Sequence, residues 1–284
     1  MPRGPDFICI GLQKAGTRWL YDQMAAADGV WMPPIKELNY FTGNCFKPLN
    51  LALVAKRDAA VAAGAAETVS DREFFEYFKR GQARGVDLDW YHGLFPSKGM
   101  CLAGDVSPEY ARMTADQIHS MAASRQNCKY VLLLRDPVSR FWSALCMRVR
   151  SGRVEEEKIG RWTDVKEILS KTGDQSFPTR IWRRWSAMLP QGSLRFWFIE
   201  DIATKPELVR EEIYRFIGGS SDLQSSLPAS FNRKRSNRKY VMNAEIHLGL
   251  ATYFNEEIQE AADLFGGHAV AWMRENRVLL RSAR

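Results

Sequence analysis

Five segments of the chain are continuous apolar runs rather than alternating patterns. They cover residues 7–10, 30–32, 100–103, 130–134 and 194–199. Strands buried on both faces of a parallel sheet carry such runs, whereas half-exposed strands alternate apolar and polar residues. The pattern therefore predicts a parallel sheet that is covered on both faces.

The stretches between these runs carry helix-start signals. Capping-box spacings and prolines suited to a first helical turn occur at Ser70 with Glu73, Thr114 with Gln117, Asp136-Pro137 and Lys205-Pro206. Strands that alternate with helices predict an α/β fold, a doubly wound parallel sheet flanked by helices. We expect helical insertions at about 46–98 and 150–190, and terminal helices over the last forty residues. Because no repeat or Gly/Ser linker interrupts the chain, residues 1–284 are expected to form a single domain.

The chain is basic. Its 284 residues carry a formal net charge of +7 at pH 7, and its isoelectric point is about 9.2. A positive field attracts anions, which leaves phosphorylated or sulfated small molecules, acidic polysaccharide and nucleic acid as candidate ligands.

The cysteines and histidines indicate the compartment of the protein and whether it binds a metal. The five cysteines are scattered without a C-x-x-C pair, and three lie in apolar runs where a thiol behaves as a small hydrophobe. The four histidines form no H-x-x-x-H pattern, so we expect no metal site. The first apolar run begins within a few residues of Met1, without a signal peptide or a bilayer-spanning stretch. These features predict a cytoplasmic, metal-independent protein.

Residues 11–18, GLQKAGTR, follow the first predicted strand and precede a predicted helix. Gly11 and Gly16 have the G-x-x-x-x-G spacing of a phosphate loop, but Thr17 stands where a nucleoside triphosphate loop requires lysine followed by Ser/Thr. In those loops the hydroxyl of the Ser/Thr after the lysine ligates the magnesium of the triphosphate. The Lys-[Ser/Thr] pair is missing here, which points to an anion that needs no metal. Backbone N–H groups at a helix N-terminus and Lys14 remain to bind it. A solvated Lys14 on a tight turn is the alternative.

The stretch GLQKAGTRWL resembles the 5'-phosphosulfate loop of sulfotransferases that use 3'-phosphoadenosine 5'-phosphosulfate (PAPS). The resemblance implies a P-loop-like fold, and a Lys14 that contacts the bridging oxygen between the phosphate and the sulfuryl group. It also implies donor binding by the whole loop: Gly11, Gln13, Lys14, Ala15, Gly16, Thr17 and Arg18. Trp19 stands where cytosolic sulfotransferases stack a tryptophan on the adenine; a core tryptophan packed against the sheet is the alternative.

Residues 130–145, YVLLLRDPVSRFWSAL, resemble the 3'-phosphate motif of the same family, R-D-P-x-x-R-x-x-S. The resemblance implies that Arg135 and Ser143 grip the 3'-phosphate, with the guanidinium supplying charge and a planar fork of donors. Arg140 either assists or is a surface cation. An ordinary helix start would explain the Asp-Pro pair alone, but not the phosphate loop upstream of it.

Two later segments extend the resemblance. Residues 194–218 match the family's strand, acidic turn and helix, an architectural piece. Residues 233–239, RKRSNRK, hold five cations in seven positions. By the resemblance, Arg233, Lys234 and Arg235 close over the donor's phosphates; a solvated or substrate-steering face is the alternative. Without interleaved aromatics the run is a weak nucleic-acid patch, so we expect no nucleic-acid partner.

Transfer to a hydroxyl requires a base, and a carboxylate or a histidine serves best. Residues 33–41, PPIKELNYF, resemble the K-E-x-x-x-F segment of heparan sulfate sulfotransferases, whose glutamate is the base. The match assigns that role to Glu37, with Lys36 beside it; two ordinary exposed loop charges are the alternative. Cytosolic sulfotransferases use a histidine, which leaves His92 and His119 as further candidates.

Residues 104–110, GDVSPEY, resemble the G-E-K-[Ser/Thr]-P-x-Y segment of the polysaccharide-modifying members. Asp105 replaces the glutamate, and Val106 replaces a lysine that lies at the active site in those enzymes. The departure leaves the acceptor class open, because one cationic contact is missing. Asp105 becomes a second candidate for acid/base or orienting work.

These resemblances imply a sulfotransferase that moves a sulfuryl group from PAPS to a hydroxyl or amine of a carbohydrate, lipid or small molecule and releases PAP. A nucleotide kinase with an altered phosphate loop and a non-catalytic PAP- or polyanion-binding module are the alternatives. The helical spacing of the aromatic residues in the insertions indicates that they form a core, and the alternative is that they line an acceptor cleft. These residues are Phe74, Phe75, Tyr77, Phe78, Trp90, Tyr91, Trp182 and Trp185. Oligomeric state cannot be read from the sequence.

Overall fold

The computed structural model describes residues 4–96, 99–125, 127–220, 223–232 and 240–283. Its centre is a five-stranded parallel sheet in the order β2-β3-β1-β4-β5. The strands are β1 (Phe7–Gly11), β2 (Val30–Trp31), β3 (Leu102–Val106), β4 (Lys129–Leu134) and β5 (Leu194–Phe198). The predicted fold class is confirmed, since each of the five apolar runs contributes to one strand.

Strand β1 occupies the middle of the sheet, with β3 on one side and β4 on the other. Phe7 pairs with Gly104 of β3, where a Cβ on the glycine would lie 2.0 Å from the Phe7 ring. Only glycine fits at this close approach. The loop after β1 is therefore flanked by the carboxyl ends of β3 and β4, where open α/β sheets bind their ligands.

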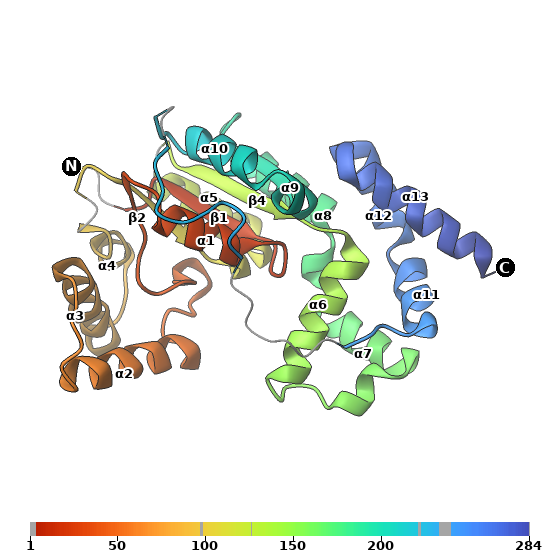
Figure 1. The fold of residues 1–284 in the computed structure, drawn as a ribbon, viewed down its shortest axis with the longest axis horizontal. Helices are drawn as coiled ribbons and strands as arrows, with labels where there is room; N and C mark the ends of the chain where they lie inside the picture. Colours follow the sequence, from red (N-terminus) through yellow and green to blue (C-terminus); the bar gives the residue numbers. More distant parts are fainter. Residues whose placement is uncertain (1–3, 97–98, 126, 221–222, 233–239, 284) are drawn as a thin grey trace.

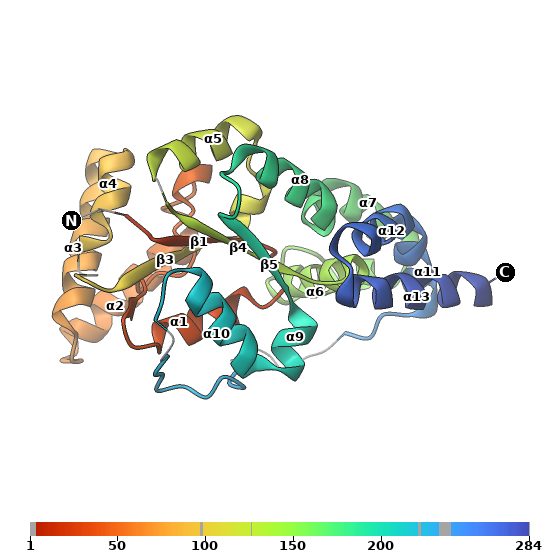
Figure 2. The same ribbon diagram turned by 90° about the horizontal axis from the view of Figure 1, so that it is seen from above.

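Helices cover both faces of the sheet (Figure 2). One face carries α1 (Thr17–Ala25) and α10 (Pro206–Phe216), and the opposite face carries α5 (Ala115–Ser124) and α8 (Pro178–Met188). Strands β1 and β4 are almost completely buried, as their continuous apolar composition predicts.

Two helical groups extend from the sheet to opposite sides (Figure 1). The first comprises α2 (Pro48–Ala62), α3 (Val69–Arg84) and α4 (Leu88–Gly93). Its aromatic side chains, among them Phe74, Phe78 and Trp90, form a second core cluster that includes Ala103 of β3. Trp185 of α8 is fully buried as well, so these aromatic residues are core rather than an open cleft.

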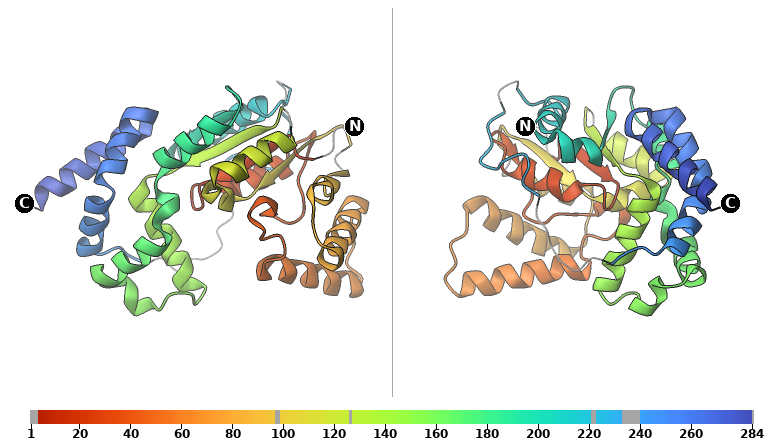
Figure 3. Two further views of the ribbon diagram at one scale, coloured as in Figure 1. Left: turned by 180° about the vertical axis from the view of Figure 1, so that it is seen from behind. Right: turned by 45° about the vertical axis from the view of Figure 1, so that its right-hand side comes forward.

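The second group lies beyond β5, and the C-terminus lies at its far end (Figure 3). It contains α6 (Pro137–Arg150), α7 (Trp162–Thr172), α11 (Ala244–Tyr253), α12 (Asn255–Phe265) and α13 (Gly267–Ser282). The short helix α9 (Ile199–Thr204) and the 3-10 turns η1 (Tyr40–Thr42), η3 (Pro108–Arg112), η4 (Glu156–Ile159) and η5 (Gly173–Ser176) complete the described elements. The predicted terminal helices are thus present.

Local predictions are partly confirmed. Thr114 and Gln117 form a reciprocal capping box, and Asp136 caps α6 with Pro137 at its first position. The Ser70 prediction is wrong, because Thr68 caps α3 by accepting a hydrogen bond from the Asp71 N–H. The third strand runs over 102–106 rather than 100–103, and its second half, which contains Asp105, is buried.

Each of the five cysteines is a free thiol, and four of them are buried. Burial raises the pKa of the Cys9 and Cys128 thiols to about 12, so both behave as small apolar side chains. Among the described residues no helix is both long and apolar enough to cross a bilayer.

Candidate active site

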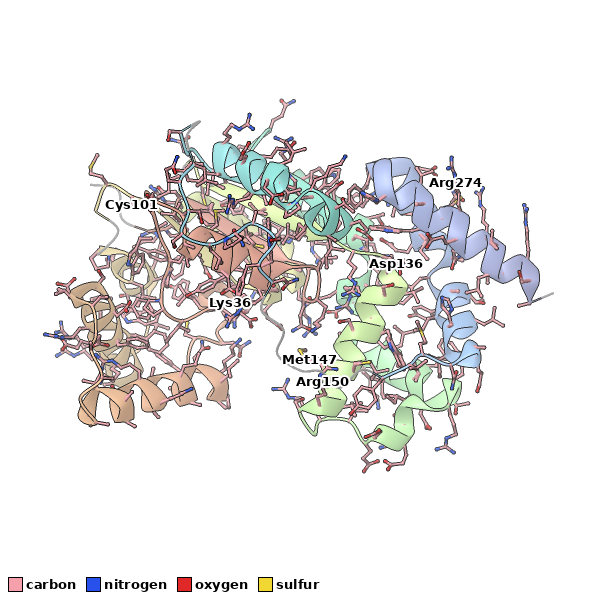
Figure 4. The ribbon with its side chains drawn as sticks, in the orientation of Figure 1. Lys36, Cys101, Asp136, Met147, Arg150 and Arg274 are labelled. Carbon is pink, nitrogen blue, oxygen red and sulfur yellow. The ribbon has the colours of Figure 1, made fainter. Side chains whose placement is uncertain are left out.

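Three of the segments singled out in the sequence follow neighbouring strands. The phosphate loop follows β1, the Arg135 motif follows β4, and Asp105 lies near the end of β3. Carboxyl ends of parallel strands meet at one edge of a sheet, so the fold brings together residues that are about 120 positions apart. Figure 4 labels Lys36, Asp136 and Met147, which mark the base segment and helix α6 around this edge.

The phosphate loop connects β1 to α1 as the sequence predicts. Gly16 precedes α1 with φ of 101° in the left-handed region, and no side chain caps the helix. A Cβ at this position would lie 3.2 Å from Ile202 as well as straining the backbone. The first N–H groups of a helix have no intrahelical partner and carry partial positive charge. The start of α1 thus offers uncapped donors to an anion, next to a half-buried Lys14.

Arg135 joins the two donor motifs directly. Its Nη1 donates a hydrogen bond of 2.8 Å to the backbone carbonyl of Lys14. Burial lowers the pKa of Arg135, although Asp136 and Glu200 partly offset this. A guanidinium remains charged nonetheless, and burial strengthens its attraction for an anion. The structure therefore places Lys14 and Arg135 in one site.

Arg140 is not a surface cation, since only 1 % of it is exposed. Its Nε donates to Ser176 Oγ at 2.6 Å, and the neighbouring Gln175 accepts a hydrogen bond of 3.2 Å from the Gln13 N–H. Turn η5 thereby supports both donor motifs. Ser143 lies on α6 one turn beyond Arg140 and is half-buried.

Trp19 takes the core position rather than an exposed one. Its side chain is 1 % exposed, and its Nε1 donates to the Ala229 carbonyl at 2.7 Å. The adenine-stacking expectation does not hold for this conformation, because the indole has no open face. Gly11, Ala15 and Thr17 are also buried, and so contribute to the loop through their backbone.

Arg18 lies close enough to the base segment to act on its charge. Its Nε lies 3.6 Å from Asp22, and its charge lowers the pKa of Lys36 after the larger effect of burial. Arg18 therefore belongs to the boundary between the donor loop and the predicted base.

Glu37 is not an ordinary exposed loop charge. One carboxylate oxygen lies 3.1 Å from Lys36 Nζ and the other lies 2.7 Å from Lys47 Nζ. Burial alone would raise the pKa of Glu37, but the two ammonium groups outweigh it and hold the pKa below its ordinary value. The side chain keeps 27 % exposure, so an ionised carboxylate stays within reach of a ligand.

The backbone holds Glu37 in an uncommon conformation, with φ of 74°. The Glu37 carbonyl accepts hydrogen bonds from the side-chain amides of Asn39 and Asn50, at 3.2 and 3.0 Å. Neither Lys47 nor Asn50 was singled out in the sequence. No local motif marks them, because they approach Glu37 only through the start of α2.

Asp105 is buried at 1 % exposure and does not face a ligand. It accepts hydrogen bonds from the hydroxyls of Ser107, Tyr91 and Tyr110, at 2.6, 3.0 and 2.8 Å. Burial raises the pKa of Asp105, although these hydrogen bonds favour its ionised form. The acid/base part of its predicted role is wrong, because no acceptor can reach the carboxyl group.

The orienting role of Asp105 fits the hydrogen bonds around it. The Leu38 N–H bonds to its carboxylate, and Ser107 Oγ accepts a 3.1 Å hydrogen bond from the Asn39 N–H. Two successive peptide groups after Glu37 are thus anchored to the end of β3. Val106, where the related segment has lysine, is buried and apolar.

The candidate histidines lie elsewhere. The His92 ring packs against Gly4, which precedes β1 and so lies at the opposite edge of the sheet from the phosphate loop. His119 is exposed on α5. Neither histidine approaches the loop, which leaves Glu37 as the candidate base.

The family model of the sulfotransferase domain matches residues 4–247. This chain belongs to the sulfotransferase family. The phosphate loop, the Arg135 motif and the candidate base all fall within the matched region, and the predicted resemblance is confirmed. A search of the curated proteins finds no match.

Two solved sulfotransferase structures share the fold. The sulfotransferase from Alicyclobacillus acidocaldarius has a TM-score of 0.65 and 19% identity, covering 94% of this chain and 98% of that one. The sulfotransferase domain from the curacin biosynthetic pathway has a TM-score of 0.54 and 19% identity. The match covers 77% of this chain and 75% of that one. The P-loop-like architecture of the present sulfotransferase is therefore shared across distant sequences.

Within the part of the sulfotransferase that the structure describes, no group of three or more His, Cys, Asp or Glu side chains could hold a metal ion. The basic run at 233–239, with Arg233, Lys234 and Arg235, lies outside the described residues.

Proposed function

We propose that the protein transfers a sulfuryl group from PAPS to a hydroxyl or amine of a carbohydrate, lipid or small-molecule acceptor and releases PAP. The observation that carries the proposal is the hydrogen bond between Arg135 Nη1 and the Lys14 carbonyl. It joins a loop suited to the phosphosulfate to a motif suited to the 3'-phosphate, so one donor molecule can bridge both.

The charges of the donor-site residues support PAPS as the donor. Lys14 and the uncapped N–H groups of α1 would bind the phosphosulfate, while Arg135 and Ser143 would bind the 3'-phosphate. A sulfuryl group carries less charge than a γ-phosphoryl group, which is why a lysine and backbone donors can suffice for it.

The reaction is an in-line displacement at sulfur. The acceptor oxygen or nitrogen forms a bond to sulfur as the bond between sulfur and the bridging phosphate oxygen breaks. Lys14 stabilises the negative charge that gathers on the departing phosphate. Glu37, which its two lysines keep ionised, takes the proton from the acceptor.

We also propose that the chain forms one domain, with α2–α4 as an insertion. The core cluster of this insertion includes Ala103 of β3, and Trp31 of β2 packs against the cluster. The insertion therefore shares apolar surface with the sheet instead of forming a separate core.

The test is incubation of the protein with PAPS and acceptor mixtures spanning glycans, lipids and phenols, with sulfated products scored by mass. We expect a sulfated product whose rate of formation Lys14→Ala lowers about 100-fold or more and EDTA leaves unchanged. PAP binding by calorimetry without product from any acceptor class would favour the non-catalytic binding module. Phosphoryl transfer from ATP that EDTA abolishes, without sulfated product, would favour the kinase-like alternative.

A further inference from the structure

A cavity of about 240 Å³ borders the donor loop. Gln13 of the loop, helix α6 and turn η5 line it, and the hydrogen bond from the Gln13 N–H to Gln175 Oε1 crosses its wall. The mechanism proposed above assigns no role to this cavity.

Arginine dominates the lining of the cavity. Arg140 and Arg148 project from α6, and Arg112 and Arg153 come from η3 and from the chain after α6. Arg140 is buried and Arg148 is half-buried, whereas Arg112 and Arg153 are exposed. The cations therefore extend from the floor of the cavity to its rim.

The acidic side chains of the lining form ion pairs with only one of these cations, Arg112, although the charge of Asp174 also favours the charged forms of Arg140 and Arg148. Arg112 Nε lies 2.7 Å from Asp174 and its Nη1 lies 3.1 Å from Glu109. Among the described residues, no carboxylate forms an ion pair with Arg140, Arg148 or Arg153. The cavity thus keeps an excess of positive charge.

Arg140 has unused hydrogen-bonding capacity. Its Nη2 is buried and has no hydrogen-bond partner among the described residues, while its Nε is held by Ser176. Burial, together with the neighbouring Arg135 and Arg148, lowers the pKa of Arg140 to about 9, although the charge of Asp174 partly offsets this. A buried cation that lacks an anionic partner is costly, and an anion in the cavity would relieve both the desolvation and the repulsion.

Burial and the charges of Arg153 and Arg112 also lower the pKa of Arg148, against the smaller effects of Asp174 and Glu109. These arginines are therefore close enough to repel one another, and like charges in a shared site are typical of one that binds an anion.

We propose that this cavity binds an anionic group of the acceptor, a sulfate, phosphate or carboxylate, beside the donor loop. Arg140 and Arg148 contact the group, and Arg112 and Arg153 guide it in. The anion site is argued from the cavity alone. The further step, that the anion belongs to the acceptor, rests on the sulfotransferase function proposed above.

The direct test is calorimetric titration with inorganic sulfate. Free sulfate can also enter the donor loop, so the titration is run on PAP-saturated protein and repeated with Lys14→Ala. We expect sulfate to bind in both, and Arg148→Gln to weaken it about 10-fold or more, the effect of one charged hydrogen bond. Arg150→Gln is the matched control, because it removes the same charge from the same helix but does not line the cavity.

Absence of sulfate binding, its loss in Lys14→Ala, or equal weakening by the Arg148 and Arg150 variants would overturn the proposal. The thermal unfolding of each variant is compared with that of the wild type to establish that it folds. If PAP itself fails to bind, the donor assignment fails, and the same comparison on the PAP-free protein still decides whether the cavity binds anions.

A second measurement connects the cavity to the acceptor. The ratio of kcat/KM for an acceptor with a carboxylate or sulfate to that of its neutral analogue is measured with PAPS. We expect the wild type to favour the anionic acceptor and Arg148→Gln to reduce that ratio about 10-fold, whereas Arg150→Gln leaves the ratio unchanged. A ratio that Arg148→Gln does not change would contradict an acceptor role.

Discussion

Lys14 and Arg135 define the donor site at the scale of single residues. Lys14 adopts φ of 74°, and its carbonyl accepts the Arg135 hydrogen bond. One peptide carbonyl thus positions the guanidinium, while the lysine side chain remains half-buried at the loop. The Arg135 guanidinium is held before the ligand arrives, which is the condition for strong electrostatic stabilisation.

Replacement of Lys14 by alanine tests its role in charge stabilisation. Because the ammonium acts on charge that develops as the sulfuryl group leaves, we expect kcat to fall about 100-fold or more. Steady-state kinetics with saturating PAPS measures the effect, and calorimetry with PAP confirms that the site persists. Unchanged turnover would refute the assignment of Lys14.

Replacement of Glu37 by glutamine tests the base. The amide cannot accept the acceptor proton, so we expect turnover to fall about 100-fold or more while PAP still binds. Since Lys36 and Lys47 hold the pKa of Glu37 below its ordinary value, this group should cause no loss of wild-type rate between about pH 6 and 8. The pH–rate profile checks this, with Glu211→Gln on the exposed face of α10 as the control.

At the scale of elements, strand β3 shows what the sequence pattern misses. An apolar run predicts where a strand is buried, but Asp105 lies beyond the predicted run 100–103, and its burial depends on the hydroxyls of Ser107, Tyr91 and Tyr110. Similarly, Arg140 reads as a surface cation because Ser176 reaches it only in the folded chain. Local signals such as the Thr114 cap were predictable since both partners lie within one turn.

Replacement of Ser107 by alanine tests the anchoring of the base segment. It removes the acceptor for the Asn39 N–H and a donor to Asp105. Because misplacement of a catalytic group by about 1 Å can cost up to ~100-fold in rate, we expect kcat to fall about 10- to 100-fold, with the PAP Kd unchanged. Ser186→Ala on α8 is the control, and a loss of PAP affinity equal to the loss of kcat would contradict a local effect.

Helix α12 docks on α8 through a buried carboxyl group. Glu257 accepts hydrogen bonds from the Thr179 N–H and hydroxyl, at 2.7 and 2.9 Å. Burial raises the pKa of Glu257 from 4.5 to about 7, against the effect of these hydrogen bonds. The folded state therefore binds a proton that the unfolded state has lost, and stability declines as the pH rises through this window.

Replacement of Glu257 by glutamine tests this linkage. Glutamine resembles the protonated form, and the Thr179 hydroxyl can turn to accept from its amide. We expect the wild-type free energy of unfolding to fall by at most about 3 kcal/mol between pH 5 and 8, at ~1.4 kcal/mol per pKa unit. In Glu257→Gln this decline should be absent; an identical pH dependence in urea unfolding of both proteins would refute it.

At the scale of the whole molecule, the sheet order converts sequence motifs into a site. The five apolar runs and the two donor motifs were sufficient to predict the fold class and the sulfotransferase family. The burial of Trp19 and the arginine-lined cavity were not predictable, because both depend on chain segments that meet only after folding. The contact between Arg135 and Lys14, which are 121 positions apart, also forms only on folding. Here, however, the resemblance to a known motif predicted that both residues belong to one site.

The most direct test of the account is calorimetric titration of PAP into the wild type and Arg135→Ala. Arg195→Ala, an exposed arginine of the neighbouring strand β5, serves as the control. We predict one PAP molecule bound per chain in the wild type and in the control, and affinity weakened about 10- to 100-fold in Arg135→Ala, as the loss of charged hydrogen bonds implies. A folded wild type that does not bind PAP, or an Arg135→Ala variant that binds it equally well, would contradict the account.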